Sequence, residues 1–281
     1  MRKLLGIAVC AIILFAQPAF VALASPHIEP VDEAAQSFYG PNEVDPQWPL
    51  VLAQNETSEK SESEIKKDDD YDDEYEDDVP LKTISDPIEG FNRAMFGLND
   101  GLYFYFFKPI GQGIKFIFPE PVRVAVRNFF YNLRFPIRFL NCLFQLKFEG
   151  AGSEFVRFLV NSTAGLAGFF DVASKAGIKN FNEDFGQTLG YWGLGNGFYL
   201  NIPFFGPSSA RDGIGLIADG FMWPPAYLDE FWYAVVIRLV EALNNVSLTI
   251  GEYEALKEAA LDPYVAVRDA YYQYRETRIK E

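Results

Sequence analysis

The sequence predicts a mainly α-helical protein with one short hairpin rich in glycine and aromatic residues. An aspartate directly before a proline marks two helix starts, at Asp86 and Asp262, because aspartate suits the N-cap and proline the first helical position. Between these starts, apolar residues recur at helical spacing and are interrupted by prolines and glycines. The hairpin is indicated by residues 183–213, where glycines alternate with aromatics and formal charge is scarce.

The first 24 residues have the pattern of a secretory signal peptide. A charged start, an apolar run over residues 4–15 and a small-x-small cleavage site ending at Ala24 follow one another. We therefore expect export and cleavage after Ala24. Lipidation at Cys10 is the alternative, although Val9 stands where a small residue is usual in a lipidation site.

Residues 25–83 are expected to form a disordered linker. The linker is Pro-rich and polar up to residue 58, and residues 59–78 then hold 12 acids and 3 bases. A segment with so much charge cannot bury enough apolar surface to offset the entropy of ordering it. Calcium binding or partner docking stays open, although the acidic segment lacks the glycine and the terminal glutamate of an EF-hand loop. The folded body is then expected over residues 84–281.

Six helices are expected in this body, each with apolar residues on one face and with a proline or a capping residue near its start. The first begins at Asp86, continues through the aromatic residues 103–107 and ends before Pro109. The other five are expected after Pro121, after Pro136, from Ser153, over 229–246 and over 262–279.

The hairpin is expected over residues 191–202. Asn196-Gly197 lies between two apolar runs, and this dipeptide is the strongest short-range hairpin signal. One predicted strand contains Trp192 and Leu194, and the other covers residues 198–202. The aromatic residues suit an interface between lipid and water, and burial in an ordinary core is the alternative.

Residues 108–147 combine basic side chains with phenylalanines. Seven Lys or Arg residues stand against one acid, Glu120, and seven phenylalanines are interleaved with them. This mixture is typical of helices in a lipid headgroup layer, with the cations at phosphates and the rings at the acyl boundary. Single-stranded nucleic acid suits the same mixture, but export argues against it; packing in a soluble core stays open. The headgroup candidates are Arg123, Arg127, Arg134 and Arg138.

The sequence excludes several kinds of chemistry. Its one histidine, His27, precedes the body, which excludes a His-dependent triad, a His general base and a His-ligated zinc site there. The chain contains neither a Gly-x-Ser-x-Gly elbow nor a P-loop. We expect no catalysis, no cofactor and no metal. No run of 18 apolar residues predicts a transmembrane helix.

Collinear motifs between residues 85 and 275 make the body resemble the MlaA (VacJ) family. These motifs are Asp86-Pro87-Ile88-Glu89-Gly90-Phe91-Asn92-Arg93, Asn128-Phe129 with Asn132-Leu133, Phe158-x-x-Asn161-Ser162-Thr163-x-Gly165-x-x-Gly168, residues 171–173, residues 183–190, residues 203–212, Asp262-Pro263-Tyr264 and residues 267–271. Together they cover the whole predicted body in one order.

The resemblance implies an outer-membrane component that maintains lipid asymmetry in bacteria with two membranes. Members of the family form a ring of amphipathic helices around a central channel, within the inner leaflet of the outer membrane, and often associate with a trimeric porin. Phospholipid misplaced in the outer leaflet passes through the channel to a soluble periplasmic carrier. For this chain the resemblance implies phospholipid as the ligand, a place on the periplasmic side of the outer membrane and no enzymatic activity.

By analogy with the family, twelve residues are candidates for binding lipid or lining the channel. For each polar one, a role in capping a helix or pairing with a nearby acid stays open. The candidates are Asn92, Arg93, Asn99, Asn128, Asn132, Asn161, Thr163, Tyr191, Gly195, Gly197, Tyr199 and Arg211.

The chain departs from the family pattern before the first motif. Members are commonly lipoproteins with the lipidated cysteine shortly before the Asp-Pro motif, whereas the acidic segment stands in that place here. Two other functions therefore stay open: a soluble periplasmic phospholipid-binding protein, and an envelope scaffold that moves no lipid.

Overall fold

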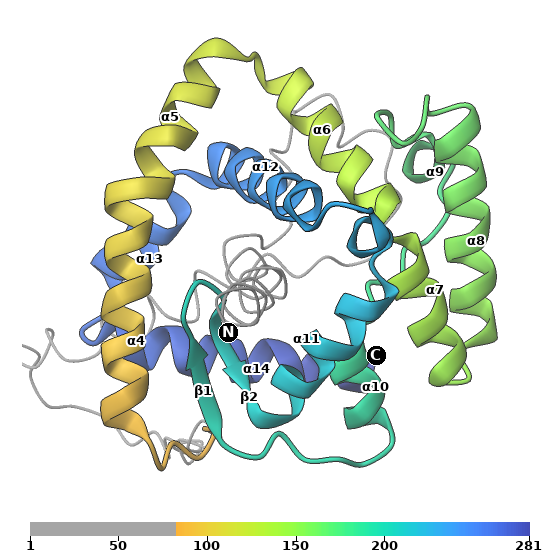
Figure 1. Cartoon of the computed structure of the whole chain (residues 1–281). Helices are drawn as coiled ribbons and strands as arrows, with labels where there is room; N and C mark the ends of the chain where they lie inside the picture. Colours follow the sequence, from red (N-terminus) through yellow and green to blue (C-terminus); the bar gives the residue numbers. More distant parts are fainter. Residues whose placement is uncertain (1–82) are drawn as a thin grey trace, which may run out of the picture. The chain divides into compact units, whose positions relative to one another are not determined.

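The computed structural model describes residues 83–281, which belong to one unit. The predicted signal peptide, Cys10 and the predicted linker up to residue 82 lie outside the described residues. The described part is mainly helical, as predicted, and its one sheet has two strands (Figure 1).

The first helices form a long continuous arm. Helix α4 (Glu89–Leu102) passes through the π-helical segment η1 (Tyr103–Phe107) directly into α5 (Lys108–Ile117). The prediction that the helix ends before Pro109 is therefore wrong. Proline lies in the first turn of α5, where its missing N–H breaks no bond, and the wide π turn before it closes through the Lys108 N–H and the Tyr103 carbonyl.

The next two predicted helices are found as α6 (Glu120–Leu133) and α7 (Phe135–Phe144), each beginning one residue before its proline, which lies in the first turn. Helix α8 (Phe148–Thr163) begins before the expected cap, so the predicted role of Ser153 is wrong. Ser153 lies inside the helix, and its hydroxyl donates to the Lys179 carbonyl instead.

Among the remaining helices, four were not predicted from the sequence. They are the short α9 (Val172–Lys175), α10 (Phe185–Tyr191), α11 (Ala210–Met222) and α13 (Glu252–Ala259). The 3₁₀ turn η2 (Pro224–Tyr227) follows α11. The last two predicted helices are found as α12 (Phe231–Thr249) and α14 (Pro263–Lys280).

Two aspartates before prolines have different roles. Asp262 caps α14, accepting hydrogen bonds from the Tyr264 and Val265 amides. Asp86 does not cap α4, which begins three residues later. Its carboxylate instead accepts from the Asn92 amide and from the Tyr264 hydroxyl, so it joins α4 to α14.

The predicted hairpin exists, but it lies further along the chain. Strand β1 (Tyr199–Ile202) pairs in antiparallel register with β2 (Gly206–Ser209), not with the segment before Asn196. Trp192 and Leu194 belong to the C-terminal end of α10, because the Leu194 amide donates to the Leu189 carbonyl. Asn196-Gly197 lies in the irregular segment before β1, where Gly197 has a left-handed backbone at φ +71°.

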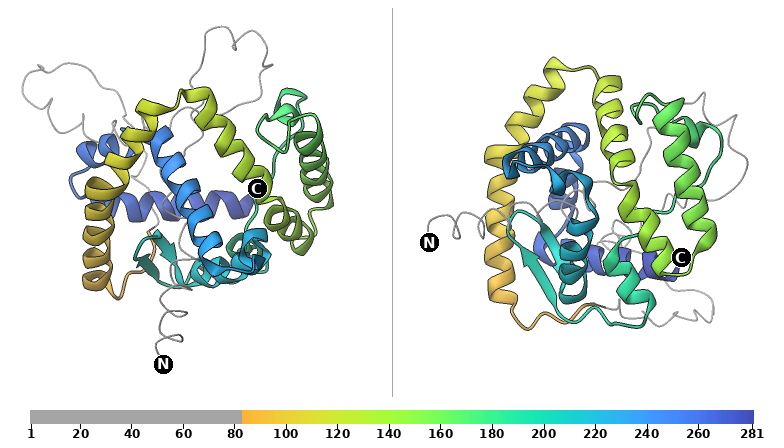
Figure 2. Two further views of the ribbon diagram at one scale, coloured as in Figure 1. Left: turned by 45° about the horizontal axis from the view of Figure 1, so that its top comes forward. Right: turned by 45° about the vertical axis from the view of Figure 1, so that its right-hand side comes forward.

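The helices are arranged around α12 (Figures 1 and 2). The arm of α4, η1 and α5 continues through a corner into α6, and α12 packs against both α5 and α6 inside this arch. Helices α7 and α8 pack against each other on one side, and α10 packs against α11 and α14.

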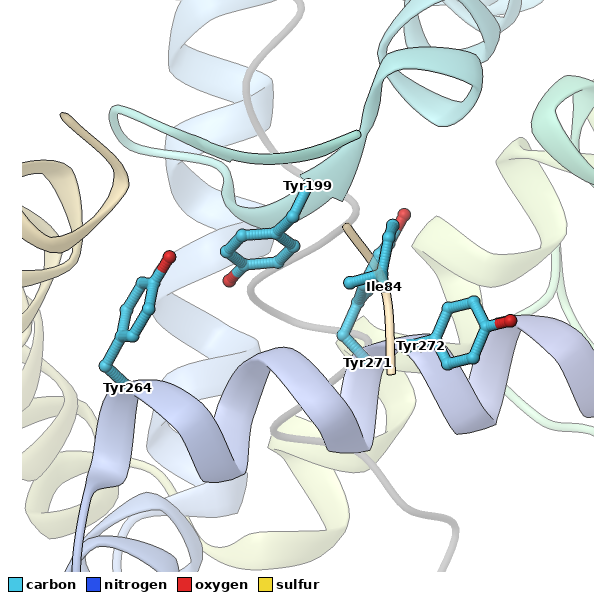
Figure 3. Close-up of a cluster of buried hydrophobic side chains, with 5 residues drawn as sticks. All are labelled: Ile84, Tyr199, Tyr264, Tyr271 and Tyr272. Atoms are coloured by element: carbon cyan, nitrogen blue, oxygen red, sulfur yellow. The ribbon is translucent and has the colours of Figure 1, made fainter. Parts of the chain in front are cut away.

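Four buried tyrosines and Ile84 form a hydrophobic cluster in the core (Figure 3). Tyr199 points from β1 onto α14, which carries Tyr264, Tyr271 and Tyr272, and Ile84 packs among them. The rings of Tyr199 and Tyr264 meet edge to face, with centroids 5.9 Å apart. The cluster fixes the hairpin on α14.

Within residues 83–281, none of the helices alone has the length and apolar composition needed to cross a bilayer. Helices α12 and α13 meet that requirement only as a pair, and the chain bends by 61° between them.

Candidate functional site

Residues 83–281 bury polar side chains and expose apolar ones. Among their fully buried side chains, polar residues outnumber apolar ones, whereas the interior of a water-soluble protein is mainly apolar. Helix α8 shows the inversion clearly. Glu154, Arg157 and Asn161 share one face at helical spacing and are buried, while Phe155 and Leu159 on another face are exposed.

The polar face of α8 is satisfied by its neighbours. The Glu154 carboxylate accepts from Arg138 Nε on α7 at 2.7 Å, and Arg157 and Asn161 both donate to Asp171, which precedes α9. Charged and amide groups thus join α7, α8 and α9, in addition to the stacked rings of Phe135 and Phe158 between α7 and α8.

Helix α12 likewise buries polar side chains and exposes apolar ones. Its Arg238, Glu241 and Asn244 are buried, while Val236 and Val240 are exposed. The Asn244 amide donates to a backbone carbonyl of α6 at 2.9 Å, so the polar face of α12 lies against the arch and an apolar face is left uncovered.

Aromatic residues are most exposed at the corner between α5 and α6. Phe116 is 92% exposed and is followed by exposed Ile117 and Phe118. Large apolar side chains at such exposure are unfavourable in water and favourable in hydrocarbon. The arrangement as a whole suits an apolar surrounding.

Two of the candidate asparagines clamp β1. Asn92 donates to the Tyr199 carbonyl at 2.9 Å and accepts from the Asn201 amide at 2.8 Å. Asn99 donates to the Ile202 carbonyl at 3.0 Å. Both side chains are buried and saturated, which gives them a structural role in this arrangement.

A second group of candidates surrounds the loop after α8. Asn132 on α6 donates to the Ser162 hydroxyl at 3.0 Å, and Asn128 reaches the Phe169 carbonyl at 3.4 Å. Thr163 is exposed and bonds back to its own helix. The twelve candidates therefore lie in separate groups rather than around one point.

The two candidate arginines have protein partners. Arg93 is exposed, with carboxylate oxygens of Glu89 and Asp262 each at 2.7 Å. Arg211 is buried and donates to Asp212 at 2.8 Å, the ion pair expected from their adjacency.

The hairpin candidates differ in exposure. Tyr191 is exposed at the end of α10 and Tyr199 is fully buried. Gly195 has open space where a side chain would extend, and a Cβ on Gly197 would lie 3.0 Å from the Ala210 side chain.

The four arginines that are candidates for binding lipid headgroups differ in how deeply their side chains are buried. Arg123 donates to the Ser247 carbonyl at 2.5 Å, and Arg138 is buried against Glu154 with its guanidinium 3.7 Å from the Tyr131 ring centre. Their guanidinium groups are thus directed to protein acceptors. Arg134 is half-buried and pairs with Glu241 at 2.8 Å. Arg127 is exposed and stays the headgroup candidate.

The sequence analysis missed a buried ionic cluster that joins α10, α11 and α14. Arg275 donates to both oxygens of Asp184, at 2.6 and 2.8 Å, and its Nε donates to Asp212 at 2.8 Å. Tyr271, one turn before Arg275, also donates to Asp212. Burial opposes ionisation of both carboxylates, but Arg275 outweighs it and holds the pKa of Asp184 and of Asp212 below their usual range. The i, i+4 spacing of Tyr271 and Arg275 was the available signal.

Asp219 on α11 lies next to this cluster without an ion pair. It accepts from the Asn141 side chain and from the Phe185 amide, both at 3.1 Å. Burial, and then the neighbouring charge of Asp184, raise the pKa of Asp219 to about 7. Residues 83–281 contain no group of three or more His, Cys, Asp or Glu side chains placed to hold a metal ion.

Comparison with known proteins assigns this arrangement to a family. Over 193 residues the chain is 34% identical to the Escherichia coli K12 protein named intermembrane phospholipid transport system lipoprotein MlaA, covering 67% of this chain and 76% of that protein. The Haemophilus influenzae protein of the same name is 30% identical over 206 residues, covering 70% and 80%. A Rickettsia bellii protein named only as uncharacterized is 30% identical over 200 residues, covering 71% and 78%.

A solved structure matches as well. It is described as the structural basis for maintenance of bacterial outer membrane lipid asymmetry, and it superposes with a TM-score of 0.62 at 32% identity, covering 69% of this chain and 99% of that chain. The family model described as MlaA lipoprotein matches residues 84–278. This protein belongs to the MlaA lipoprotein family.

Proposed function

We propose that this protein is the outer-membrane component of a phospholipid transport system. It removes misplaced phospholipid from the outer leaflet and passes it to a soluble periplasmic carrier, which keeps the membrane asymmetric. The names of the similar Escherichia coli and Haemophilus influenzae proteins support transport between membranes. The description of the matching structure supports a role in lipid asymmetry.

The observation that carries this proposal is the inverted distribution of side chains. Buried arginine, glutamate and asparagine hold the helices together, and phenylalanine and leucine cover their outer faces. In water these outer faces favour aggregation, but in a lipid leaflet they are favourably solvated and the internal polar contacts are strengthened. The helices therefore lie within one leaflet as a ring around a lipid channel.

The finer parts of the proposal follow from the family. The protein faces the periplasm, is retained beside a trimeric porin, and exposes polar candidates such as Thr163 and Arg127 to lipid headgroups. Tyr191, Gly195 and Gly197 lie where the channel narrows. The reaction is movement of an intact lipid, with no bond made or broken.

Two alternatives make different predictions about solubility and transport. A soluble periplasmic phospholipid carrier leaves the membrane in salt. An envelope scaffold stays in the membrane but moves no lipid.

Sequential extraction of membranes tests the proposal. We expect the mature protein, with Ser25 at its N-terminus, to resist high salt and alkaline carbonate and to be released only by detergent. Release by salt would reject the embedded ring in favour of the soluble carrier. Retention together with unchanged surface phospholipid after deletion of the protein would favour the scaffold.

A further inference from the structure

Arg238 is a buried arginine without a protein acceptor. It lies in the middle of α12 and is 6% exposed. Within residues 83–281 no carboxylate lies within ion-pair distance of its guanidinium, no acceptor receives a hydrogen bond from it, and its Nε is completely covered. The unpartnered cation is unexpected at this depth, because a buried charge is strongly destabilising unless it is paired.

The other buried arginines show how unusual this is. Each of the five has at least one acceptor among the described residues: a backbone carbonyl, a carboxylate or both. They are Arg123, Arg138, Arg157, Arg211 and Arg275. The five structural arginines therefore all have hydrogen-bond acceptors for their guanidinium groups, and Arg238 differs from them in having none in the described part of the chain.

The neighbours of Arg238 do not neutralise it. Its guanidinium lies 3.9 Å from the centre of the buried Trp223 ring, and burial, together with the like charge of Arg134, lowers the pKa of Arg238 to about 9. Of the two nearby acids, Glu241 is committed to Arg134 at 2.8 Å. Asp219 accepts from neutral donors, and because its pKa is raised to about 7, it is only partly ionised at neutral pH.

Further donors near Arg238 are also unused. Arg134 Nε and Trp223 Nε1 are covered and have no hydrogen-bond partner. A stacked, planar guanidinium with free N–H groups is suited to a phosphate, which it can bind through two parallel hydrogen bonds.

We propose that Arg238 is the anchor of an internal anion site that binds the phosphate of a phospholipid through its terminal guanidinium nitrogens. This inference rests on the proposed function for the source of the phosphate. The site gives the lipid phosphate a defined contact on α12, inside the arch of α5 and α6, rather than leaving the lipid to move through the channel without a specific headgroup contact.

Ligand-dependent melting of the purified full chain tests this site. Delipidated protein in detergent is titrated with short-chain phosphatidylglycerol, with diacylglycerol of the same chains, and with inorganic phosphate. We expect phosphatidylglycerol to raise the melting temperature of the wild-type protein, and diacylglycerol and inorganic phosphate to do so far less. In Arg238→Met, the apparent affinity for phosphatidylglycerol falls at least about tenfold. Lys175→Met removes an exposed positive charge on α9 and leaves the affinity unchanged.

The ligand-free proteins give a second readout. Because Arg238→Met removes an uncompensated buried charge, its melting temperature without lipid should equal or exceed that of the wild type. A structural arginine predicts the opposite. If Arg238→Met does not fold, Arg238→Lys is used, and its weaker, single-point contact should still reduce the affinity.

Three results would overturn the site. They are equal phosphatidylglycerol affinity in the wild type and Arg238→Met, equal affinity of the wild type for phosphatidylglycerol and diacylglycerol, and equal protection by inorganic phosphate, which would indicate a site for the free ion. None of these measurements depends on transport, so the site can fail while the extraction and lipid-asymmetry results still support the proposed function.

Discussion

The side-chain amide of Asn92 donates a 2.9 Å hydrogen bond to the carbonyl of Tyr199, 107 residues further along the chain. The Asn201 amide returns a bond of 2.8 Å to the same side chain. Asn99, about two turns later on α4, repeats the contact at Ile202. A two-stranded sheet is only marginally stable by itself. The two asparagines add hydrogen bonds from α4 to the backbone of β1 and so stabilise the sheet.

Replacing Asn92 by leucine should destabilise the fold strongly. The change removes the bonds to β1 and leaves a buried carbonyl and a buried N–H without partners, which costs about 2–4 kcal/mol. Thermal unfolding of the purified protein in detergent measures the loss. The neighbouring Arg93→Met breaks exposed ion pairs and the contact of the guanidinium with the Tyr264 ring, 4.4 Å from the ring centre, and should cost clearly less. Equal losses in the two variants would show that Asn92 is not a clamp.

The sequence identified these residues without their roles. Asn92 stands in the first family motif, but its partners in β1 are more than 100 residues away and no local pattern indicates them. The hairpin was misplaced for a related reason. The Asn-Gly dipeptide is a local signal, whereas β1 pairs with residues beyond Pro203 and packs through Tyr199 on the distant α14.

Burial was the property that the sequence predicted least well. Local spacing found most helices because caps, prolines and periodicity act within a turn or two. The same periodicity cannot tell which face is inside. In α8 and α12 the polar face is buried, so Arg123 and Arg138 hold the fold together instead of being free for headgroups. Arg238 could have been noticed as a charge in the middle of an apolar helix.

Gly215 should be irreplaceable at the contact between α11 and α10. A Cβ added there would lie 2.4 Å from the Gly186 nitrogen and 2.8 Å from its Cα, so backbone would have to move. We expect Gly215→Ala to cost about 1–3 kcal/mol. Gly213 lies on the same helix, and a Cβ there would meet only Ile202 at 4.0 Å. Gly213→Ala should therefore be neutral or stabilising by about 0.5–1 kcal/mol. A reversed order of the two melting temperatures would contradict the close approach.

Gly195→Leu tests the channel without disturbing the fold. Gly195 has nothing within 4 Å of an added Cβ and no left-handed backbone, so the melting temperature should be unchanged. If this segment lies where the channel narrows, phospholipid should accumulate in the outer leaflet, as measured by labelling of surface phospholipid in cells. Gly152→Leu, also at an open position, is the control and should keep the wild-type level. Normal asymmetry in Gly195→Leu would remove this segment from the channel.

Phe116 and Ile117 should contribute to membrane retention. Both are exposed at the corner between α5 and α6, and each large apolar side chain gains about 1.5–3 kcal/mol in an apolar phase. The double variant Phe116→Asp, Ile117→Asp should be released by alkaline carbonate in a larger fraction than the wild type. Lys175→Asp introduces an acid at an exposed site on α9 and should be retained normally. Identical extraction of all three proteins would place the corner outside the lipid.

Asp219 should make the protein less stable as the pH rises from about 4 to about 7. Its pKa is about 7 in the fold and about 3.9 in an unfolded chain, so in this window the folded state holds the extra proton and stability falls with increasing pH. Asp184 and Asp212 behave oppositely. Their pKa values are depressed, so their contribution is complete above pH of about 4 and is lost only as the pH falls below it.

The Asp219→Asn variant separates these effects. An asparagine oxygen still accepts from the Phe185 amide but does not titrate, so the variant should melt at nearly the same temperature at pH 5 and pH 8. At pH 8 it should be more stable than the wild type by about 2–4 kcal/mol, since each pKa unit corresponds to about 1.4 kcal/mol. Asp184→Asn weakens the partner of the buried Arg275 and should instead destabilise at pH 8. Parallel pH profiles for the wild type and Asp219→Asn would mean that Asp219 is already ionised in the fold, and that Asn141 and the N-terminal end of α10 stabilise its charge.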